Sequence, residues 1–289
     1  TMQKVENKMA NESMCVANVF GLDGSSIENV LDLLKDNIDQ CVYSYIDLVE
    51  YGTSNPNFCT FLVRNDNDQI LSIFTKYYDS IQIYDLSGAC DCVAVCIHEY
   101  ALNNGIKAVF GESSIIKAIS RLSNNASIEY GHVAKYSYTD RFVRNHWNCI
   151  EEARSDCDFK QIAELICSDS SMGSINEKDQ LAETLNSRYK SGFGRSLVIR
   201  INGDIVAHAA TYAEIVDVAV IGGVITRIDQ RGNGYSSSLV SYLCNILSNE
   251  KKQIYLFWYS EGAFRIYSKI GFENVVEWAK LIIAPKAKL

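Results

Sequence analysis

The sequence predicts an α/β (α+β) protein of two tandem domains, each with a mixed, mostly antiparallel central sheet flanked by helices. Two observations support this class. The order helix, three strands, helix, strand, helix, strand occurs in the N-terminal half and again in the C-terminal half. In addition, 47% of the 289 residues are hydrophobic and 21% are charged, which is ample material for a core. We expect domains at residues 1–140 and 141–289.

In the N-terminal half, hydrophobic spacing predicts most of the elements. Two serines before a run of apolar residues with helical spacing predict a helix that starts at Ser25. Segment 41–50 is apolar and rich in tyrosine, and its type stays open. The strands that we expect are 58–63, 70–77, 79–86, 107–110 and 126–138, and the further helices are 90–101 and 115–122.

The C-terminal half repeats this order after a connection at 140–149. A capping box, Ser174 to Glu177, predicts the start of a helix that ends near Lys190. Asn202-Gly203-Asp204 predicts a hairpin turn. The strands that we expect are 149–154, 196–201, 205–212, 216–226, 251–258 and 272–283, and the further helices are 158–167, 237–248 and 260–270.

Residues 216–248 combine an apolar strand, a glycine-containing turn and the start of an amphipathic helix. Glycine lets a ligand approach the backbone closely. The first turn of a helix offers unpaired N–H groups and the positive end of the helix dipole. The spacing excludes the ATP-binding pattern G-x-x-x-x-G-K-[ST] and does not suit the dinucleotide pattern G-x-G-x-x-G. The stretch therefore predicts a site for a different phosphate-bearing ligand.

Arg231-Gly232-Asn233-Gly234-Tyr235-Ser236 resembles the acyl-CoA signature R/Q-x-x-G-x-G/A of the GNAT acyltransferase superfamily, with Ser236 where Gly or Ala is usual. Residues 263–272 resemble the A-x-x-x-Y-x-x-x-G-F segment of the same family. The resemblance implies a GNAT fold for the C-terminal half. The repeated element order suggests that the N-terminal half is a degenerate GNAT-like domain. The corresponding turn there, 86–91, has one glycine and no arginine, and its Asp91 would repel a phosphate.

The resemblance also implies an acetyl-CoA-dependent N-acetyltransferase in which a primary amine attacks the thioester directly. Tyr267 stands at the position of the family's general acid for the leaving sulfur. Ser260 stands where the family commonly has Asn. Gly222-Gly223 suits a strand bulge. The residues that would hold acetyl-CoA are Val224, Ile225, Thr226, Arg231, Gly232, Asn233, Gly234, Tyr235, Ser236, Ser237 and Ser260.

The general base stays open at this level. Glu214 lies between the third and fourth strands and is the first candidate, with Asp217 and His208 as alternatives. A chain of water molecules would need no single base. Trp258 and Tyr259 are expected either to wall the acceptor pocket or to pack in the core.

Composition restricts the partners and the compartment. A net charge of −8 argues against general binding of nucleic acid or anionic membranes. The chain shows no signal-peptide core and no apolar run of the ~20 residues that a membrane helix needs, which predicts a cytoplasmic protein. We expect a monomer or homodimer, and no metal: Cys90, Cys92 and Cys96 cluster near His98 but lack a full set of ligands with known spacing.

Two other functions are compatible with the fold. One is a non-catalytic, regulatory GNAT-like protein that binds acyl-CoA. The other is an aminoacyl transferase like the Fem group, which pairs two GNAT-like domains and uses aminoacyl-tRNA. The acidic chain and the intact loop at 231–236 disfavour the second.

Overall fold

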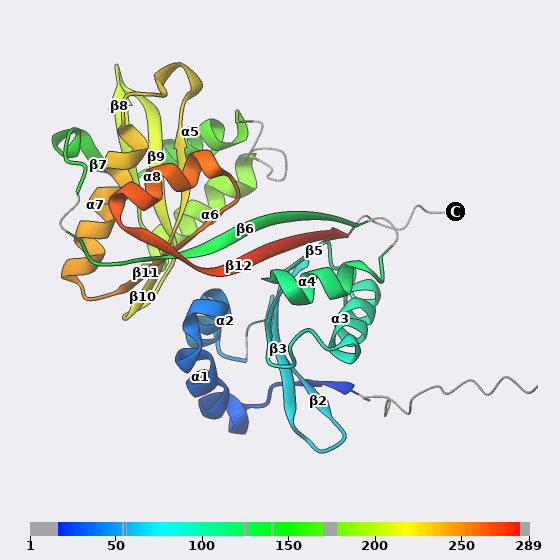
Figure 1. Cartoon of the computed structure of the whole chain (residues 1–289). Helices are drawn as coiled ribbons and strands as arrows, with labels where there is room; N and C mark the ends of the chain where they lie inside the picture. Colours follow the sequence, from blue (N-terminus) through cyan, green and yellow to red (C-terminus); the bar gives the residue numbers. More distant parts are fainter. Residues whose placement is uncertain are drawn as a thin grey trace, which may run out of the picture.

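The computed structural model describes residues 17–53, 55, 57–123, 126–139, 142–169 and 178–283. It confirms the predicted class, with mixed strands and flanking helices (Figure 1). The elements of the N-terminal half are β1 (Ala17–Gly21), α1 (Ile27–Asp36), α2 (Ile38–Tyr51), β2 (Phe58–Asn65), β3 (Ile70–Tyr77), β4 (Ser80–Asp85), α3 (Asp91–Asn103), β5 (Ala108–Glu112), α4 (Ser113–Ser120) and β6 (Ala126–Tyr136).

The elements of the C-terminal half are β7 (Ile150–Glu152), α5 (Asp156–Cys167), α6 (Lys178–Ser191), β8 (Ser196–Ile201), β9 (Asp204–Glu214), β10 (Val218–Thr226), α7 (Tyr235–Asn249), β11 (Gln253–Trp258), α8 (Glu261–Ile270) and β12 (Phe272–Ile283). The capping box expected at Ser174 to Glu177 lies outside the described residues. A capping box does start α5, where Ser155 and Asp158 bond each other's backbone N–H.

Segment 41–50, whose type was open, belongs to α2. Most of its side chains from Ile38 to Leu48 are buried, including the polar ones of Ser44 and Asp47. A helix that is covered on nearly every side has no polar stripe, so its sequence lacks the period that marks a surface helix. The helix is buried in this way because it lies between the N-terminal strands and the C-terminal half, where it packs against β9 and β10.

Within the described ranges, twelve strands form one sheet in the order β1-β2-β3-β4-β5-β12-β6-β11-β10-β9-β8-β7. The two halves exchange their last strands: β12 pairs with β5, and β6 pairs with β11. The long antiparallel pair of β6 and β12 joins the halves (Figure 1). The division at residues 140 and 141 stays a prediction for the chain, and the sheet itself does not break between the two halves.

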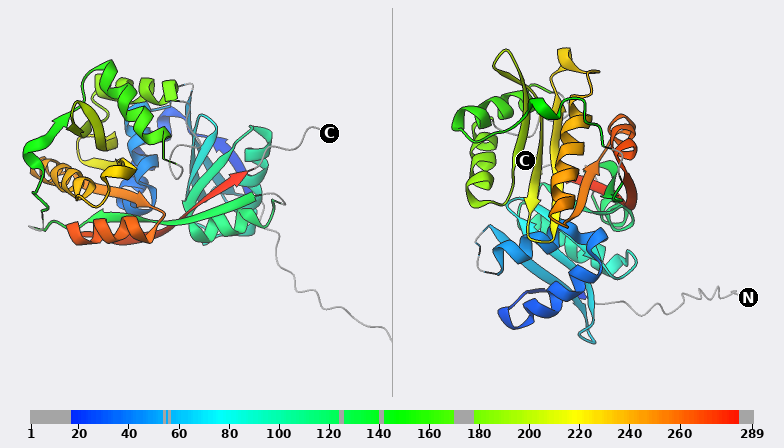
Figure 2. Two further views of the ribbon diagram at one scale, coloured as in Figure 1. Left: turned by 90° about the horizontal axis from the view of Figure 1, so that it is seen from above. Right: turned by 90° about the vertical axis from the view of Figure 1, so that its left-hand side faces the viewer.

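Strand β11 has α2 on one face and α8 on the other. Phe257 stacks on Tyr43 of α2, with ring centroids 5.1 Å apart. The next residue, Trp258, stacks on Phe264 of α8 at 4.7 Å. Successive side chains of a strand point to opposite faces, so the two helices cover opposite sides of the sheet (Figure 2, left). The candidate site lies on the α8 side.

Candidate active site

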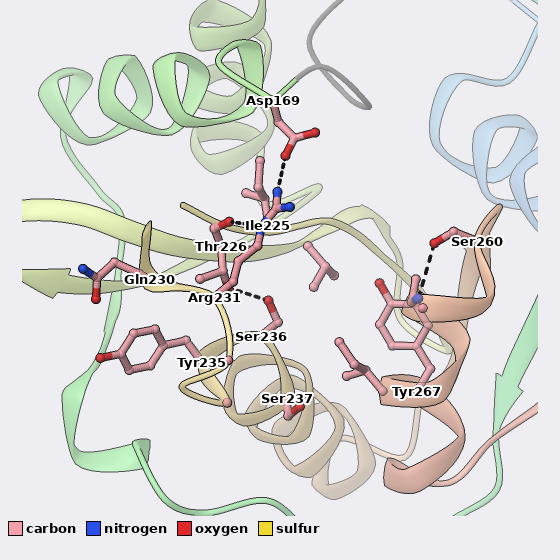
Figure 3. A pocket seen from close by; sticks show the side chains of 16 residues that line it. Asp169, Ile225, Thr226, Gln230, Arg231, Tyr235, Ser236, Ser237, Ser260 and Tyr267 are labelled. Atoms are coloured by element: carbon pink, nitrogen blue, oxygen red, sulfur yellow. Dashed lines mark hydrogen bonds and ion pairs between the residues drawn. The ribbon is translucent and has the colours of Figure 1, made fainter. Parts of the chain in front are cut away.

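A cavity of about 630 Å³ lies between the end of β10, the start of α7 and the start of α8 (Figure 3). Every residue expected to hold acetyl-CoA lines it except Asn233, and Tyr267 lines it as well. The lining residues that the sequence did not single out are Asp169, Gln230, Gly262, Ala263 and Ile266. The local motifs therefore come together in space around one opening.

The cavity exists because two parallel strands separate. Strands β10 and β11 pair only as far as Ile221 and Leu256. Beyond this point the register of β10 with β9 is irregular, as the bulge expected at Gly222-Gly223 requires. Gly223 has a φ of +61°, and a Cβ on it would lie 2.5 Å from the hydroxyl of Tyr212. A side chain is therefore excluded from this position by both strain and space.

The glycine turn presents backbone N–H groups to the cavity. Gly232 and Gly234 have φ values of +87° and +80°, and the space beside each is open for at least 4 Å. Gly234 is the N-cap of α7 and no side chain caps the helix there. The first helical bond at this end runs from Ser238 N–H to the Gly234 carbonyl, 3.0 Å. The N–H groups of residues 235–237 are thus directed at the cavity, where an anion would satisfy them.

Side-chain contacts hold the turn in place. The Arg231 guanidinium forms an ion pair with Asp169, and its Nε donates to the Thr226 carbonyl at 3.1 Å (Figure 3). The hydroxyls of Thr226 and Ser236 are 2.7 Å apart, so the serine that departs from the family pattern makes a contact that Gly or Ala lacks. His146 Nε2 lies 2.9 Å from the Asn233 carbonyl, on the outside of the turn.

Tyr267 meets the requirements for a proton donor. It projects from α8 into the cavity (Figure 3), is 8% exposed, and packs edge-on against Phe272. Burial raises the pKa of Tyr267 to about 12, so the phenol keeps its proton at neutral pH. Ser260 begins the same helix, because its hydroxyl accepts from the Ala263 N–H at 3.3 Å.

The structure does not bring Glu214 to the cavity. Glu214 pairs with Ala219 at the opposite end of β10, about 15 Å along the strand from Val224 at ~3.3 Å per residue. Its carboxylate forms ion pairs with Arg195 and with Lys252, the second at 3.0 Å. Burial by itself raises the pKa of Glu214. The hydrogen bonds from Arg195 and Thr211 and the nearby positive charge lower it by more, so the pKa lies below its ordinary value. Glu214 is thus held as an anion by structural partners.

The alternative bases are also engaged. Asp217 lies at the same end of β10 as Glu214 and accepts from the Tyr45 hydroxyl at 3.5 Å. His208 is fully buried, and its Nδ1–H donates to the carbonyl of Gly223 in the bulge at 2.8 Å. Burial lowers the pKa of His208 to about 4, so the ring is neutral at physiological pH. His208 therefore stabilises the bulge through this hydrogen bond.

Trp258 and Tyr259 differ in their surroundings. Trp258 is buried between the rings of His132 and Phe264, and its Nε1 donates to Asn274 at 2.8 Å. It belongs to the core. Tyr259 is 44% exposed at the end of β11.

In the N-terminal half, a carboxylate of the protein itself accepts hydrogen bonds from the backbone of the turn at 86–91. The Asp85 carboxylate accepts from the backbone N–H groups of Ser87 and Ala89, at 3.2 and 2.6 Å. These are the kind of groups that would face a phosphate in the C-terminal turn. The contact gives a physical reason for the predicted loss of donor binding in this half.

Across the residues with a described placement, no group of three or more His, Cys, Asp or Glu side chains is arranged to hold a metal ion. The described helices include none with the length and apolar composition needed to cross a bilayer.

Comparison with known proteins identifies the C-terminal half. Residues 155–275 match the family model described as "Acetyltransferase (GNAT) domain". No curated protein matches the sequence.

Solved structures of similar fold extend the likeness to both halves. A GNAT-family acetyltransferase from Colwellia psychrerythraea is 10% identical, with 92% of this chain and 100% of that chain covered and a TM-score of 0.58. A GCN5-related N-acetyltransferase from Sphaerobacter thermophilus is 12% identical, with 94% and 98% covered and a TM-score of 0.64. A tandem GNAT protein from the clavulanic acid biosynthesis pathway is 12% identical, with 94% and 100% covered and a TM-score of 0.60. At these identities the likeness establishes the fold, and the predicted resemblance is confirmed.

Proposed function

Because residues 155–275 form a GNAT domain within a chain of tandem GNAT fold, we propose that the protein is an acetyl-CoA-dependent N-acetyltransferase with one active site per chain. The site is the cavity between β10, α7 and α8. The proposal rests on one observation: an uncapped helix N-terminus and a buried, protonated tyrosine line the same cavity. The first suits a pyrophosphate and the second suits a leaving thiolate.

Different residues along the cavity would bind different parts of acetyl-CoA. The N–H groups at 235–237 would bind the pyrophosphate of acetyl-CoA, with Gly232 and Gly234 leaving room for it. Residues 224–226 at the end of β10 would hydrogen-bond the pantetheine arm through their backbone and polarise the thioester carbonyl. No metal is needed for this division of roles.

The reaction is a direct transfer. The amine nitrogen attacks the thioester carbonyl carbon and forms the new C–N bond, after which the C–S bond breaks. The sulfur leaves with a proton from the Tyr267 hydroxyl, and the nitrogen loses one proton overall. We further propose that the protein acts in the cytoplasm as a monomer or homodimer.

A thermal shift assay with acetyl-CoA tests donor binding. At about 100 times Kd the ligand should add about 2.7 kcal/mol to the free energy of unfolding, which raises Tm. Release of CoA thiol from a panel of primary amines then tests transfer. Absence of a Tm shift with every acyl-CoA tried would refute the proposal. A shift without thiol release for any amine would favour the non-catalytic, regulatory alternative, and transfer from aminoacyl-tRNA alone would favour the Fem-like one.

A further inference from the structure

A second group of polar and aromatic side chains lies on the other side of the sheet, where α2 meets the C-terminal half. Tyr43, Asp47 and Tyr51 stand four residues apart on α2 and therefore share one face of the helix. Tyr43 stacks on Phe257 of β11. Tyr51 packs against Phe193, just after α6, at 5.7 Å. Asp47 lies between these two tyrosines and so faces the C-terminal half.

Asp47 is buried without a partner. Its side chain is 8% exposed, and in the described part of the chain its carboxylate makes no hydrogen bond and no ion pair. A buried carboxylate that lacks a partner is costly in its charged form. Burial raises the pKa of Asp47 to about 7, against the opposing charge of Arg188, and the negative charge of Glu50 adds to the rise. A carboxyl with this pKa can both accept and release a proton near neutral pH.

Arg188 supplies a cation to the same space. It lies in the last turn of α6, and its guanidinium lies over the ring of Tyr212, 5.1 Å from the centroid. Burial raises the pKa of both Tyr43 and Asp47, and the charge of Arg188 opposes the rise at each, so Arg188 lies within electrostatic range of both. Yet Arg188 and Asp47 do not approach within 4.0 Å as an ion pair in the described part of the chain. Arg188, Tyr43 and Tyr212 each keep part of their accessible surface, so the charges are not sealed in a filled core.

These polar and aromatic side chains come close to the donor cavity at the bulge of β10. The Tyr212 ring lies against Gly222 and Gly223, so closely that a Cβ on Gly222 would come within 2.7 Å of it. The next residue, Val224, lines the cavity. Strands β10 and β11 separate at this level, beyond Ile221. The charged group and the donor cavity thus approach one break in the sheet from its two faces.

We propose that the space between α2, the end of α6 and the bulge of β10 binds the acceptor, and that the acceptor is a free amino acid. Its ammonium group would lie beside Asp47 and its carboxylate at Arg188, so that each unpaired charge gains a partner. The N-terminal half then completes the active site of the C-terminal half. This assignment rests on the proposed acetyl transfer.

Asp47 also has a chemical role in this arrangement. Its carboxylate takes one proton from the ammonium group, and the resulting neutral amine forms the C–N bond with the thioester carbon. The nitrogen then releases its second proton to water, the C–S bond breaks, and the sulfur takes the proton of Tyr267. Asp47 then gives its proton to water and Tyr267 regains one from water, so the balance is one amide, one CoA thiol and one released proton.

Isothermal titration calorimetry of the whole chain tests the site. Each titration is done once without nucleotide and once with CoA bound. The probes are the standard amino acids and, for each one that binds, the decarboxylated amine. Asp47→Asn removes the carboxylate charge at constant size, and Arg188→Gln removes the cation. Asp36→Asn is the matched control, because Asp36 is an exposed aspartate at the end of α1 and the same substitution removes its charge.

We expect Asp47→Asn to raise the Kd of the amino acid about tenfold or more, as for the loss of one charge-assisted hydrogen bond. Arg188→Gln should weaken the amino acid similarly and leave the decarboxylated amine nearly unchanged. Asp36→Asn should change neither affinity. In turnover, kcat/KM of the unaltered chain should fall as pH drops below about 7, and Asp47→Asn should remove that dependence.

Equal affinities for Asp47→Asn and Asp36→Asn would overturn the inference, as would equal binding of amino acid and amine. So would a chain that binds acetyl-CoA but no standard amino acid. The titration without nucleotide separates this inference from the proposed function. Amino-acid binding that depends on Asp47 in a chain that never binds acetyl-CoA would support the site and refute acetyl transfer.

Discussion

Removing the charge of Asp47 should stabilise the protein, and the gain should depend on pH. Asp47 is 8% exposed and burial raises its pKa from 3.8 to about 7. Between these values the folded chain binds more protons at this position than the unfolded chain does. The contribution of Asp47 to the free energy of unfolding therefore falls as pH rises from about 4 to about 7, and the full penalty is present above that range.

The magnitude follows from the two pKa values. Their difference, from 3.8 to about 7, corresponds to about 4 kcal/mol at ~1.4 kcal/mol per pH unit. Asp47→Asn cannot ionise, so it should exceed the unaltered chain by about 4 kcal/mol near pH 8 and by only about 1 kcal/mol near pH 4.5. At roughly 2 °C per kcal/mol for a chain of this length, Tm should rise by roughly 8 °C near pH 8.

Differential scanning calorimetry of both proteins across this pH range measures the effect, with Asp36→Asn as the control that removes an exposed charge of the same sign from the neighbouring helix α1. The gain for Asp47→Asn should grow with pH, and the control should show no such trend. An Asp47→Asn protein whose Tm is unchanged or lower near pH 8 would refute the placement of an unpaired buried carboxylate at this position.

Three further substitutions test the cavity and its surroundings. Tyr267→Phe should lower kcat about 100-fold and leave the Kd of acetyl-CoA nearly unchanged, because the phenol donates a proton only as the sulfur leaves; steady-state kinetics with an equal kcat would remove Tyr267 as the acid. Gly234→Val should abolish acetyl-CoA binding in calorimetry while the circular dichroism spectrum persists, since φ is +80° and a side chain would cost about 1–3 kcal/mol there; retained affinity would contradict the phosphate role of the turn. Glu214→Gln should lower the free energy of unfolding by about 2 kcal/mol, because Arg195 and Lys252 lose the buried one of the two carboxylates that they share and keep Glu250; a large loss of kcat with unchanged stability would restore Glu214 as the base.

The donor site was predictable because it is built from neighbours in sequence. A strand, a turn and a helix that follow one another place Thr226, Arg231 and the N–H groups at 235–237 together through covalent connection and local hydrogen bonds. Tyr267 follows on the next strand-helix unit, at a spacing that the motif specifies. Periodicity and turn chemistry act over such short distances, so the order of elements and the donor cavity could be derived before the structure.

Contacts between distant residues were not predictable in this way. Glu214 stood in a suitable place between two strands, but its partners Arg195 and Lys252 come from different elements and make it structural. Asp169 reaches Arg231 across 62 residues, and nothing local to either residue indicates the pair. The short edge strand β1 also carries no clear pattern of its own and is defined by its pairing with β2.

The sequence by itself determined the fold class, and it located the turn and the tyrosine to which we propose to assign phosphate binding and acid catalysis, because each depends on residue types at short spacing. Only the tertiary structure decided which strands exchange between the halves, since the residue pattern of β6 or β12 marks a strand without specifying its neighbours, and long-range packing selects them. The same packing turns one face of α2 toward the C-terminal half. It thereby makes Asp47 a neighbour of Arg188, about 140 residues away in sequence, and no local rule encodes that contact.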